Sequence, residues 1–242
     1  MTDFSRYSRQ VVLPEVGVNG QALLRDSTVL LVGLGGLGSL TALYLAGAGV
    51  GRLLLCDPDQ VSISNLHRQV IYREADLGRN KAEATAAQLR ALNPQASTEV
   101  VAPEAWPARL GEVDLVLDGT DNFTARFATN HACVRARVPL VFAAAIRFEG
   151  QVGVIDPARA GGCYACLYPT VGEAAERCEE AGILGPVVGT MAAQQALLAQ
   201  RRLLGLAEDA GTLHTWNAQT LEWRRHRLPR DPDCPCCATP TP

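Results

Sequence analysis

Short apolar runs alternate with helix-length segments between residues 28 and 145. The runs Thr28–Val32 and Leu53–Cys56 are almost entirely apolar, which is typical of strands that are buried on both faces of a sheet. The same pattern predicts further strands over Thr98–Ala102, Val113–Leu117 and Pro139–Ala143, and helices over Ser39–Gly47, Lys81–Leu92 and Thr124–Arg135. Strands and helices that alternate in this way predict an α/β fold with a parallel sheet covered on both faces.

The pattern changes in the last third of the chain. Gly150–Ile155 predicts a strand that leaves the parallel arrangement, and Leu213–Asn217 with Leu221–Arg227 predicts a hairpin. The segments around them are predicted to be a crossover loop, a helix with one apolar face and a tail rich in proline and cysteine, over Cys163–Gly185, Pro186–Leu204 and Pro229–Pro242. We therefore expect antiparallel strands to extend the parallel sheet, and the first 27 residues to form a helical arm.

Composition and charge exclude several classes of protein. With 242 residues, of which 48% are hydrophobic and 19% charged, the chain is long enough for a packed core and is not of a disordered type. A net charge of −3 makes nucleic acid an improbable partner. No apolar run is long enough to cross a membrane, and the N-terminus does not resemble a secretory signal. These features predict a cytoplasmic protein without a membrane partner.

A glycine-rich turn lies between the first predicted strand and the helix that follows it. Gly33, Gly35 and Gly38 fit the pattern G-x-G-x-x-G, and Gly36 adds a fourth glycine. Such a turn lets phosphates approach the backbone at a helix N-terminus. Asp57 ends the second strand, where a carboxylate can accept hydrogen bonds from ribose hydroxyls. The arrangement predicts a nucleotide site on a Rossmann-like, doubly wound sheet, although glycine turns also occur for packing alone.

Basic residues come after this site in the sequence, and they favour a triphosphate over a dinucleotide as its ligand. The segment Ser64–Gln69 contains Arg68, and Lys81 is the single lysine among 22 basic residues. Asn80 and Glu83 have capping-box spacing, which places Lys81 in the first turn of a helix. A cation there opposes the helix dipole, and an anion in front of it would explain the placement. The alternative is a solvated lysine at a frayed helix end.

Asp121 follows the fourth predicted strand, next to Asn122. In a sheet with the order 3-2-1-4-5, this strand neighbours the first, so the carboxylate would lie beside the glycine turn. A carboxylate beside phosphates is repelled unless a divalent cation lies between them, so Asp121 is a candidate magnesium ligand. It is also a candidate N-cap for the following helix, and the two roles are compatible.

The cysteines predict a structural zinc site. Two Cys-x-x-Cys pairs, Cys163 with Cys166 and Cys234 with Cys237, supply the four thiolates that tetrahedral zinc prefers. Cys236 is a surplus candidate, and only the spacing favours Cys237. A redox or disulfide pair is the competing interpretation. Cys178 lies among glutamates, which disfavour the reactive thiolate form, although a covalent role for this thiol stays open.

Taken together, these motifs resemble the MoeB/ThiF family, bacterial relatives of the ubiquitin-activating enzymes, and within it they are most like MoeB. The resemblance covers almost the whole chain. It rests on Arg6–Gln10, Gly33–Gly38, Asp57, Ser64–Gln69, Lys81, Thr120–Asn122, Ala145–Arg147, Glu149–Gln151, the two cysteine pairs and Cys178–Gly182.

The resemblance implies an adenylyltransferase. ATP and Mg²⁺ would adenylate the C-terminal glycine of a ubiquitin-like sulfur carrier of the MoaD or ThiS type, for molybdopterin or thiamine synthesis, and a separate protein would donate the sulfur. By analogy Asp57 binds the ribose and Asp121 the magnesium, while Arg9 reaches into the site of the other subunit of a homodimer. The remaining nucleotide-binding residues would be the four glycines, with Ser64, Asn65, Arg68, Lys81 and Asn122, of which Asn65, Arg68 and Lys81 hold the phosphates.

The resemblance also suggests a division of the chain. We expect a dimer-contacting arm over residues 1–27, a nucleotide-binding part over 28–150, and a part of the same domain over 151–242 that carries the carrier surface, the crossover loop and the zinc. Three other functions stay open: an NAD-dependent oxidoreductase, an enzyme that activates a carboxylate on modified tRNA, and a scaffold without activity. The sequence does not choose between the two types of carrier.

Overall fold

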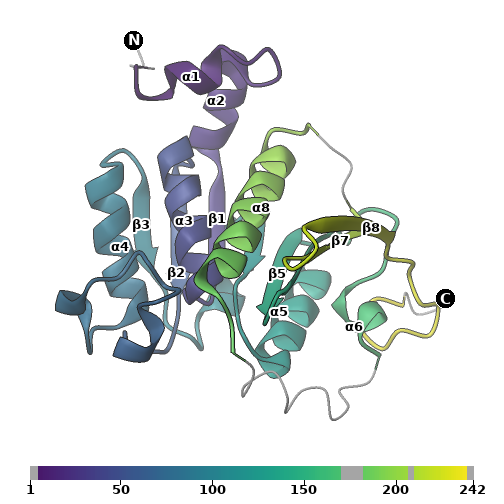
Figure 1. Ribbon diagram of the computed structural model, residues 1–242. Coiled ribbons are helices and arrows are strands. Elements are labelled where there is room, and N and C mark those ends of the chain that lie inside the picture. Colours follow the sequence, from purple (N-terminus) through teal and green to yellow (C-terminus); the bar gives the residue numbers. More distant parts are fainter. Residues whose placement is uncertain (1–4, 170–181, 207–209, 239–242) are drawn as a thin grey trace.

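The computed structural model describes residues 5–169, 182–206 and 210–238. Its centre is an eight-stranded mixed sheet with the strand order β3-β2-β1-β4-β5-β6-β7-β8 (Figure 1). The first five strands run parallel and the last three are added antiparallel. The strands are β1 Thr28–Val32, β2 Arg52–Cys56, β3 Ser97–Val100, β4 Leu115–Asp118, β5 Leu140–Ile146, β6 Glu149–Ile155, β7 Thr212–Asn217 and β8 Glu222–Arg227. The predicted α/β class, the strand order and the antiparallel extension are confirmed.

The parallel strands β1, β2, β4 and β5 each contribute to two hydrophobic cores, one on either face of the sheet. In β1, Val29 and Leu31 pack into one core, and Leu30 and Val32 pack into the other. This alternation follows from the opposite directions of successive side chains in a strand. It explains why the strands read as continuous apolar runs in the sequence.

Helices cover both faces of the sheet. The first core is closed by side chains from α2, α3, α4 and α8, and α3 packs beside α8 (Figure 1). The second is closed by α5, α6 and a 3₁₀ helix that contains Trp106. The helices are α1 Ser8–Val11, α2 Gly17–Asp26, α3 Gly36–Ala48, α4 Lys81–Leu92, α5 Phe123–Ala136, α6 Tyr164–Leu167 and α8 Gly185–Leu203, with 3₁₀ helices over Ser5–Tyr7, Ile63–Asn65, Glu74–Asp76 and Trp106–Glu112. Among the described residues, no helix is both long and apolar enough to span a membrane.

Two asparagines set the starts of the helices that flank the site. Asn80 Oδ1 accepts hydrogen bonds from the backbone N–H groups of Ala82 and Glu83, at 2.9 and 3.2 Å, so α4 begins at Lys81 as predicted. Asn122 Oδ1 accepts from Ala125 N at 2.9 Å and caps α5. The expectation that Asp121 is this cap was wrong, because Asn122 is the residue that directly precedes the first helical position. The Asp121 side chain is therefore not used for capping.

The N-terminal arm is anchored by polar contacts. Tyr7 is buried, its hydroxyl donates to Gln95 Oε1, and Asn93 Nδ2 donates to the Tyr7 hydroxyl at 2.8 Å and to Ala46 O at 2.7 Å. Helix α2 leads directly into β1. The arm therefore lies at the amino end of the parallel strands, and Arg9 on α1 is exposed there.

Candidate active site

A cavity of about 410 Å³ lies at the carboxyl ends of the parallel strands. It is lined by the glycine turn after β1, by the segment after β2, by the start of α4 and by the segment after β4. Many predicted nucleotide-site residues meet there: Gly33, Gly35, Gly36, Asp57, Arg68, Lys81, Asp121 and Asn122. Crossover connections put loops from neighbouring parallel strands at this edge, which is where ligands bind in open α/β sheets.

The glycine turn allows two loops to touch through their backbones. Gly33 has a φ of +86°, and a Cβ there would lie 2.8 Å from the carbonyl carbon of Gly119. A Cβ on Gly38 would lie 1.9 Å from the carbonyl oxygen of Gly33. Helix α3 begins after Gly35, which has no side chain to cap it. The first backbone N–H groups of α3 are therefore left to a ligand in the cavity.

Asp57 is nearly buried and fixes two loops. Its Oδ2 accepts from Leu34 N at 2.6 Å, and its Oδ1 accepts from Asp59 N at 2.8 Å. Burial raises the pKa of this carboxyl, and the hydrogen bond from Leu34 and the charge of Lys81 offset part of the rise. The side chain thus stands at the wall of the cavity with its position set from both sides.

Lys81 is held by a carboxylate that the sequence analysis did not identify. Its Nζ forms an ion pair with Asp59 Oδ2 at 2.8 Å, and the exposed fractions of the two side chains are 7% and 65%. Both residues line the cavity. The position of Asp59, two residues beyond Asp57 in the same turn, was the signal available in the sequence. The ammonium is buried at the edge of the cavity rather than solvated at a frayed helix end.

The segment that follows the Ile63–Asn65 helix brings a second cation to the cavity. The Arg68 guanidinium donates to Ser64 O at 3.1 Å and lies 2.9 Å from His67 Nε2. Ser64 and Asn65 do not line the cavity, and the Asn65 carbonyl instead accepts from the N–H groups of Arg68 and Gln69. Gln69 lines the cavity, is buried, and has an Oε1 without a hydrogen-bond partner. Sequence reasoning assigned Gln69 no role.

The loop after β4 is held rigidly around Asp121. Asp118 Oδ1 accepts from the N–H and the hydroxyl of Thr120, at 2.9 and 2.6 Å. Arg126 on α5 donates from Nε and Nη2 to Thr120 O, at 3.2 and 2.8 Å. These contacts fix the backbone on one side of Asp121, and the Asn122 cap fixes it on the other. Asp121 itself is exposed to the cavity.

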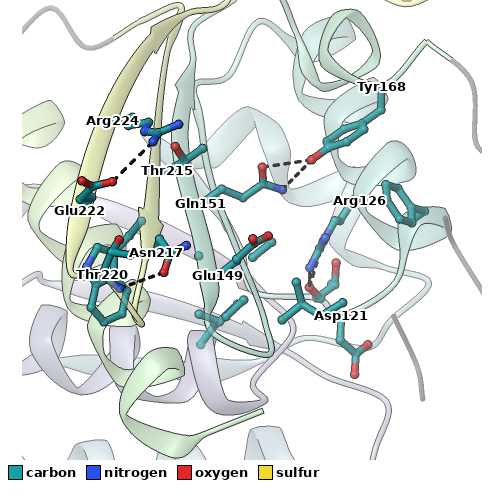
Figure 2. A pocket seen from close by; sticks show the side chains of 18 residues that line it. Asp121, Arg126, Glu149, Gln151, Tyr168, Thr215, Asn217, Thr220, Glu222 and Arg224 are labelled. Atoms are coloured by element: carbon teal, nitrogen blue, oxygen red, sulfur yellow. Dashed lines mark hydrogen bonds and ion pairs between the residues drawn. The ribbon is translucent and has the colours of Figure 1, made fainter. Parts of the chain in front are cut away.

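A second cavity, of about 620 Å³, continues from the first. Leu37, Thr120, Asp121 and Ala145 line both. Its walls come from β5, β6, β7, β8 and α5 and from Tyr168, whose hydroxyl exchanges hydrogen bonds with the Gln151 amide at 2.8 and 3.0 Å. Figure 2 shows Asp121 and Arg126 on one side of this cavity and Glu222 and Arg224 on the other. Nothing in the sequence analysis predicted it, because strands distant in sequence form its walls.

The four predicted cysteines meet at one point. The Sγ atoms of Cys163, Cys166, Cys234 and Cys237 all lie within 4.8 Å of one another. The Cys163–Cys234 and Cys166–Cys237 separations are 3.7 and 3.4 Å. A zinc tetrahedron with Zn–S bonds of about 2.3 Å has an S–S edge of about 3.8 Å, so the cluster has the right size for zinc. Cys236 is not in this set; its Sγ accepts from Asn130 Nδ2 at 3.2 Å.

One further predicted residue, Arg9, lies away from the cavities. Arg9 lines neither of them, in agreement with its place at the opposite end of the sheet. Cys178 lies outside the described residues.

Comparisons with known proteins agree with the fold. Residues 7–236 match the ThiF family. The chain is 44% identical over 239 residues to the sulfur carrier protein ThiS adenylyltransferase of Escherichia coli, covering 97% of this chain and 95% of that protein. It is 43% identical over 237 residues to the molybdopterin-synthase adenylyltransferase of the same organism, covering 96% and 95%. The crystal structure of E. coli MccB with ATP superposes with a TM-score of 0.82 at 26% identity, covering 97% of this chain and 75% of that one.

Proposed function

The chain belongs to the ThiF family, and from this membership and the geometry of the site we propose that it uses ATP to adenylate the C-terminal glycine of a ubiquitin-like sulfur-carrier protein. Both E. coli relatives are adenylyltransferases, and their names give the two pathways, thiamine and molybdopterin synthesis. The observation that carries the proposal is the pair of joined cavities. One gathers Lys81, Arg68 and Asp121 around the glycine turn, and the other offers room for a chain terminus.

The proposed reaction needs positioned charges more than a general base. A carboxylate oxygen of the carrier attacks the α-phosphorus of ATP, and a new O–P bond forms. The bond from that phosphorus to the bridging oxygen breaks, and its electron pair leaves with pyrophosphate. The attacking carboxylate is already ionised at pH 7, so no proton is removed. Such a reaction depends on alignment and on stabilising the charge that moves to the leaving group.

The residues of the first cavity bind different parts of ATP. Asp57 faces the ribose, and the free N–H groups at the start of α3 face the phosphates. Lys81 and Arg68 neutralise the phosphate oxygens, and Asn122 and the glycines shape the walls. Ser64 and Asn65 do not line the cavity, so only the family resemblance supports a role for them in binding the phosphates.

Both metals fit the residues that would hold them. Asp121 offers one exposed carboxylate where phosphates would lie, and Mg²⁺ is commonly bound by one or two carboxylates together with substrate phosphates. Bound there, Mg²⁺ would neutralise the phosphates and the leaving pyrophosphate. Zinc at the four cysteines would be structural, joining the C-terminal segment to the start of α6. A thiolate site of this kind suits the reducing cytoplasm, where we place the protein.

We also propose that the active unit is a homodimer. Arg9 lies at the amino end of the strands of its own subunit, and only a partner subunit could present it to a nucleotide. The sulfur donor would be a separate protein that acts on the acyl-adenylate. The two types of carrier and the tRNA carboxylate of the alternative function differ in size and charge, and the test below separates them.

Pyrophosphate exchange tests the proposal. Labelled pyrophosphate should enter ATP only when Mg²⁺ and a MoaD-type or ThiS-type carrier with an intact terminal glycine are present. The same carriers without that glycine are the matched control. Exchange supported by modified tRNA and by neither carrier would favour the alternative, and exchange without any acceptor would remove the proposal.

A further inference from the structure

We propose that Arg126 binds the terminal carboxylate of the carrier where the two cavities join, and so aligns it for attack on ATP. This inference rests on the proposed function and goes beyond it, because none of the motifs that carry the family resemblance includes Arg126. The proposal starts from the substrate: its reacting group is an anion that must come close to other anions.

The position of Arg126 suits this role. The side chain comes from the second turn of α5, is 8% exposed, and lines the second cavity. It donates to the carbonyl of Thr120, a residue that lines both cavities, as does Asp121 beside it. Figure 2 shows Arg126 next to Asp121, at the side of the cavity away from Arg224. A chain end that crosses the second cavity toward a nucleotide in the first would pass the guanidinium.

The guanidinium is oriented, and the one carboxylate whose charge it is shown to influence, Asp118, is not within ion-pair distance. Its Nε and Nη2 both donate to the single carbonyl of Thr120, which fixes the plane of the group. Lys81 has Asp59 at 2.8 Å, and Arg224 has Glu222 at 3.5 Å. Within the described part of the chain, Arg126 has no such carboxylate. A planar, pre-oriented fork is the geometry that receives a carboxylate.

The electrostatic surroundings require a cation here. Asp121 and Glu149 line the second cavity and would repel an arriving carboxylate, as would the phosphates of the nucleotide. Asp118 is buried at the end of β4, and burial raises the pKa of its carboxyl. The charge of Arg126 offsets part of this rise, which shows that the guanidinium exerts its charge in a region with little water. Lys81 and Arg68 line the first cavity alone. Arg224 is exposed and already paired.

The test compares two forms of one carrier that differ only in the chemical group at the C-terminus. Calorimetry without ATP measures the affinity of the carrier with its free C-terminal carboxylate and of the same carrier with a C-terminal carboxamide. For wild-type protein we expect the carboxylate form to bind about tenfold more tightly, the scale of one charge-assisted hydrogen-bonded contact. Arg126→Gln should reduce this ratio to about one and leave the affinity of the carboxamide form unchanged. Arg224→Gln, which alters the other cation of the cavity, should keep the wild-type ratio.

The outcomes distinguish failure of the role assigned to Arg126 from failure of the proposed function. If wild-type protein discriminates and Arg126→Gln discriminates equally, the assignment of Arg126 is wrong and the proposed function stands. If wild-type protein binds neither form of any carrier, the proposed function fails. If Arg126→Gln does not fold, Arg126→Lys carries the test, because it keeps the charge and loses the fork. Arg126→Lys should then weaken the preference for the carboxylate, and an Arg126→Lys protein that binds ATP and keeps the full wild-type preference overturns the proposal.

Discussion

Replacement of Lys81 by alanine is expected to remove activity and to leave the fold intact. After the substitution Asp59, which is 65% exposed, can be rehydrated, and the buried Asp57 keeps its hydrogen bonds from the backbone of Leu34 and Asp59. The lost ion pair contributes about 1 kcal/mol. The loss is offset by removal of a cation that opposes the α4 dipole, worth about 0.3–1 kcal/mol, and by the higher helix propensity of alanine. The free energy of unfolding should change by less than about 1 kcal/mol, which corresponds to a Tm shift of at most about 2–4 °C.

The effect of this substitution on catalysis should be far larger. A preorganised charge on the reacting group, in a site sheltered from water, contributes about 2.7–4 kcal/mol to the transition state. At about 1.36 kcal/mol for each factor of ten, Lys81→Ala should lower kcat/KM for pyrophosphate exchange about 10²–10³-fold. The side chain is 7% exposed and lines the cavity, so it meets the condition of shelter.

Arg90→Ala is the matched control. Arg90 is a basic residue near the other end of α4, where it donates to Thr98 and does not line the cavity. Exchange is measured for both variants at saturating carrier, with thermal unfolding followed in parallel. Near-wild-type exchange by Lys81→Ala, in a protein that melts normally, would refute the role of this cation. A large loss in Arg90→Ala would show that the charge of the helix, and not the site, is responsible.

Other substitutions test the turn, the zinc cluster and the surface charges. Gly33→Ala should destabilise the protein by about 3 kcal/mol in denaturant titration, because its Cβ meets backbone at 2.8 Å at a φ of +86°. Gly78→Ala, at a φ of +79° in open space, should cost about 1 kcal/mol. Cys237→Ser should abolish zinc binding in elemental analysis and lower Tm, whereas Cys236→Ser should keep the zinc. Hydrogen bonds from two arginines lower the pKa of Glu99 to about 2, so its stabilisation is present above the unfolded pKa and is lost as pH falls from about 4.5 toward 2. Glu99→Gln should therefore lower the free energy of unfolding by less than about 1 kcal/mol at pH 7, and by nothing measurable at pH 2.

Local signals in the sequence were enough for the parallel half of the fold. The strand Thr28–Val32 and the helix Lys81–Leu92 have the predicted bounds, because one is a buried apolar run and the other begins at an asparagine cap. Other bounds moved by a few residues, as in α3, which was predicted over Ser39–Gly47 and extends over Gly36–Ala48. The choice between Asp121 and Asn122 as the cap of α5 depended on the conformation of the turn, which the sequence does not specify.

The site was predictable only where a motif marks it. The glycine turn, Asp57, Lys81 and the cysteine pairs have short-range patterns, and the structure brings them to a common cavity or cluster. Arg126 has none. Asp59 and Gln69 lie in or beside a motif but were given no role, since their importance comes from what the fold puts opposite them. The second cavity depends on the antiparallel pairing of β5, β6, β7 and β8, in which the pairing of β6 with β7 joins segments that are distant in the sequence.

Under the proposed function, this protein joins AMP to the terminal carboxylate of a sulfur carrier. Intact-mass spectrometry of the carrier after incubation with the protein, ATP and Mg²⁺ detects that product. We expect a carrier heavier by one adenylyl group, formed with intact carrier and absent when the terminal glycine is removed or when NAD replaces ATP. A carrier of unchanged mass in every incubation, with NAD bound to the protein in place of ATP, would contradict it.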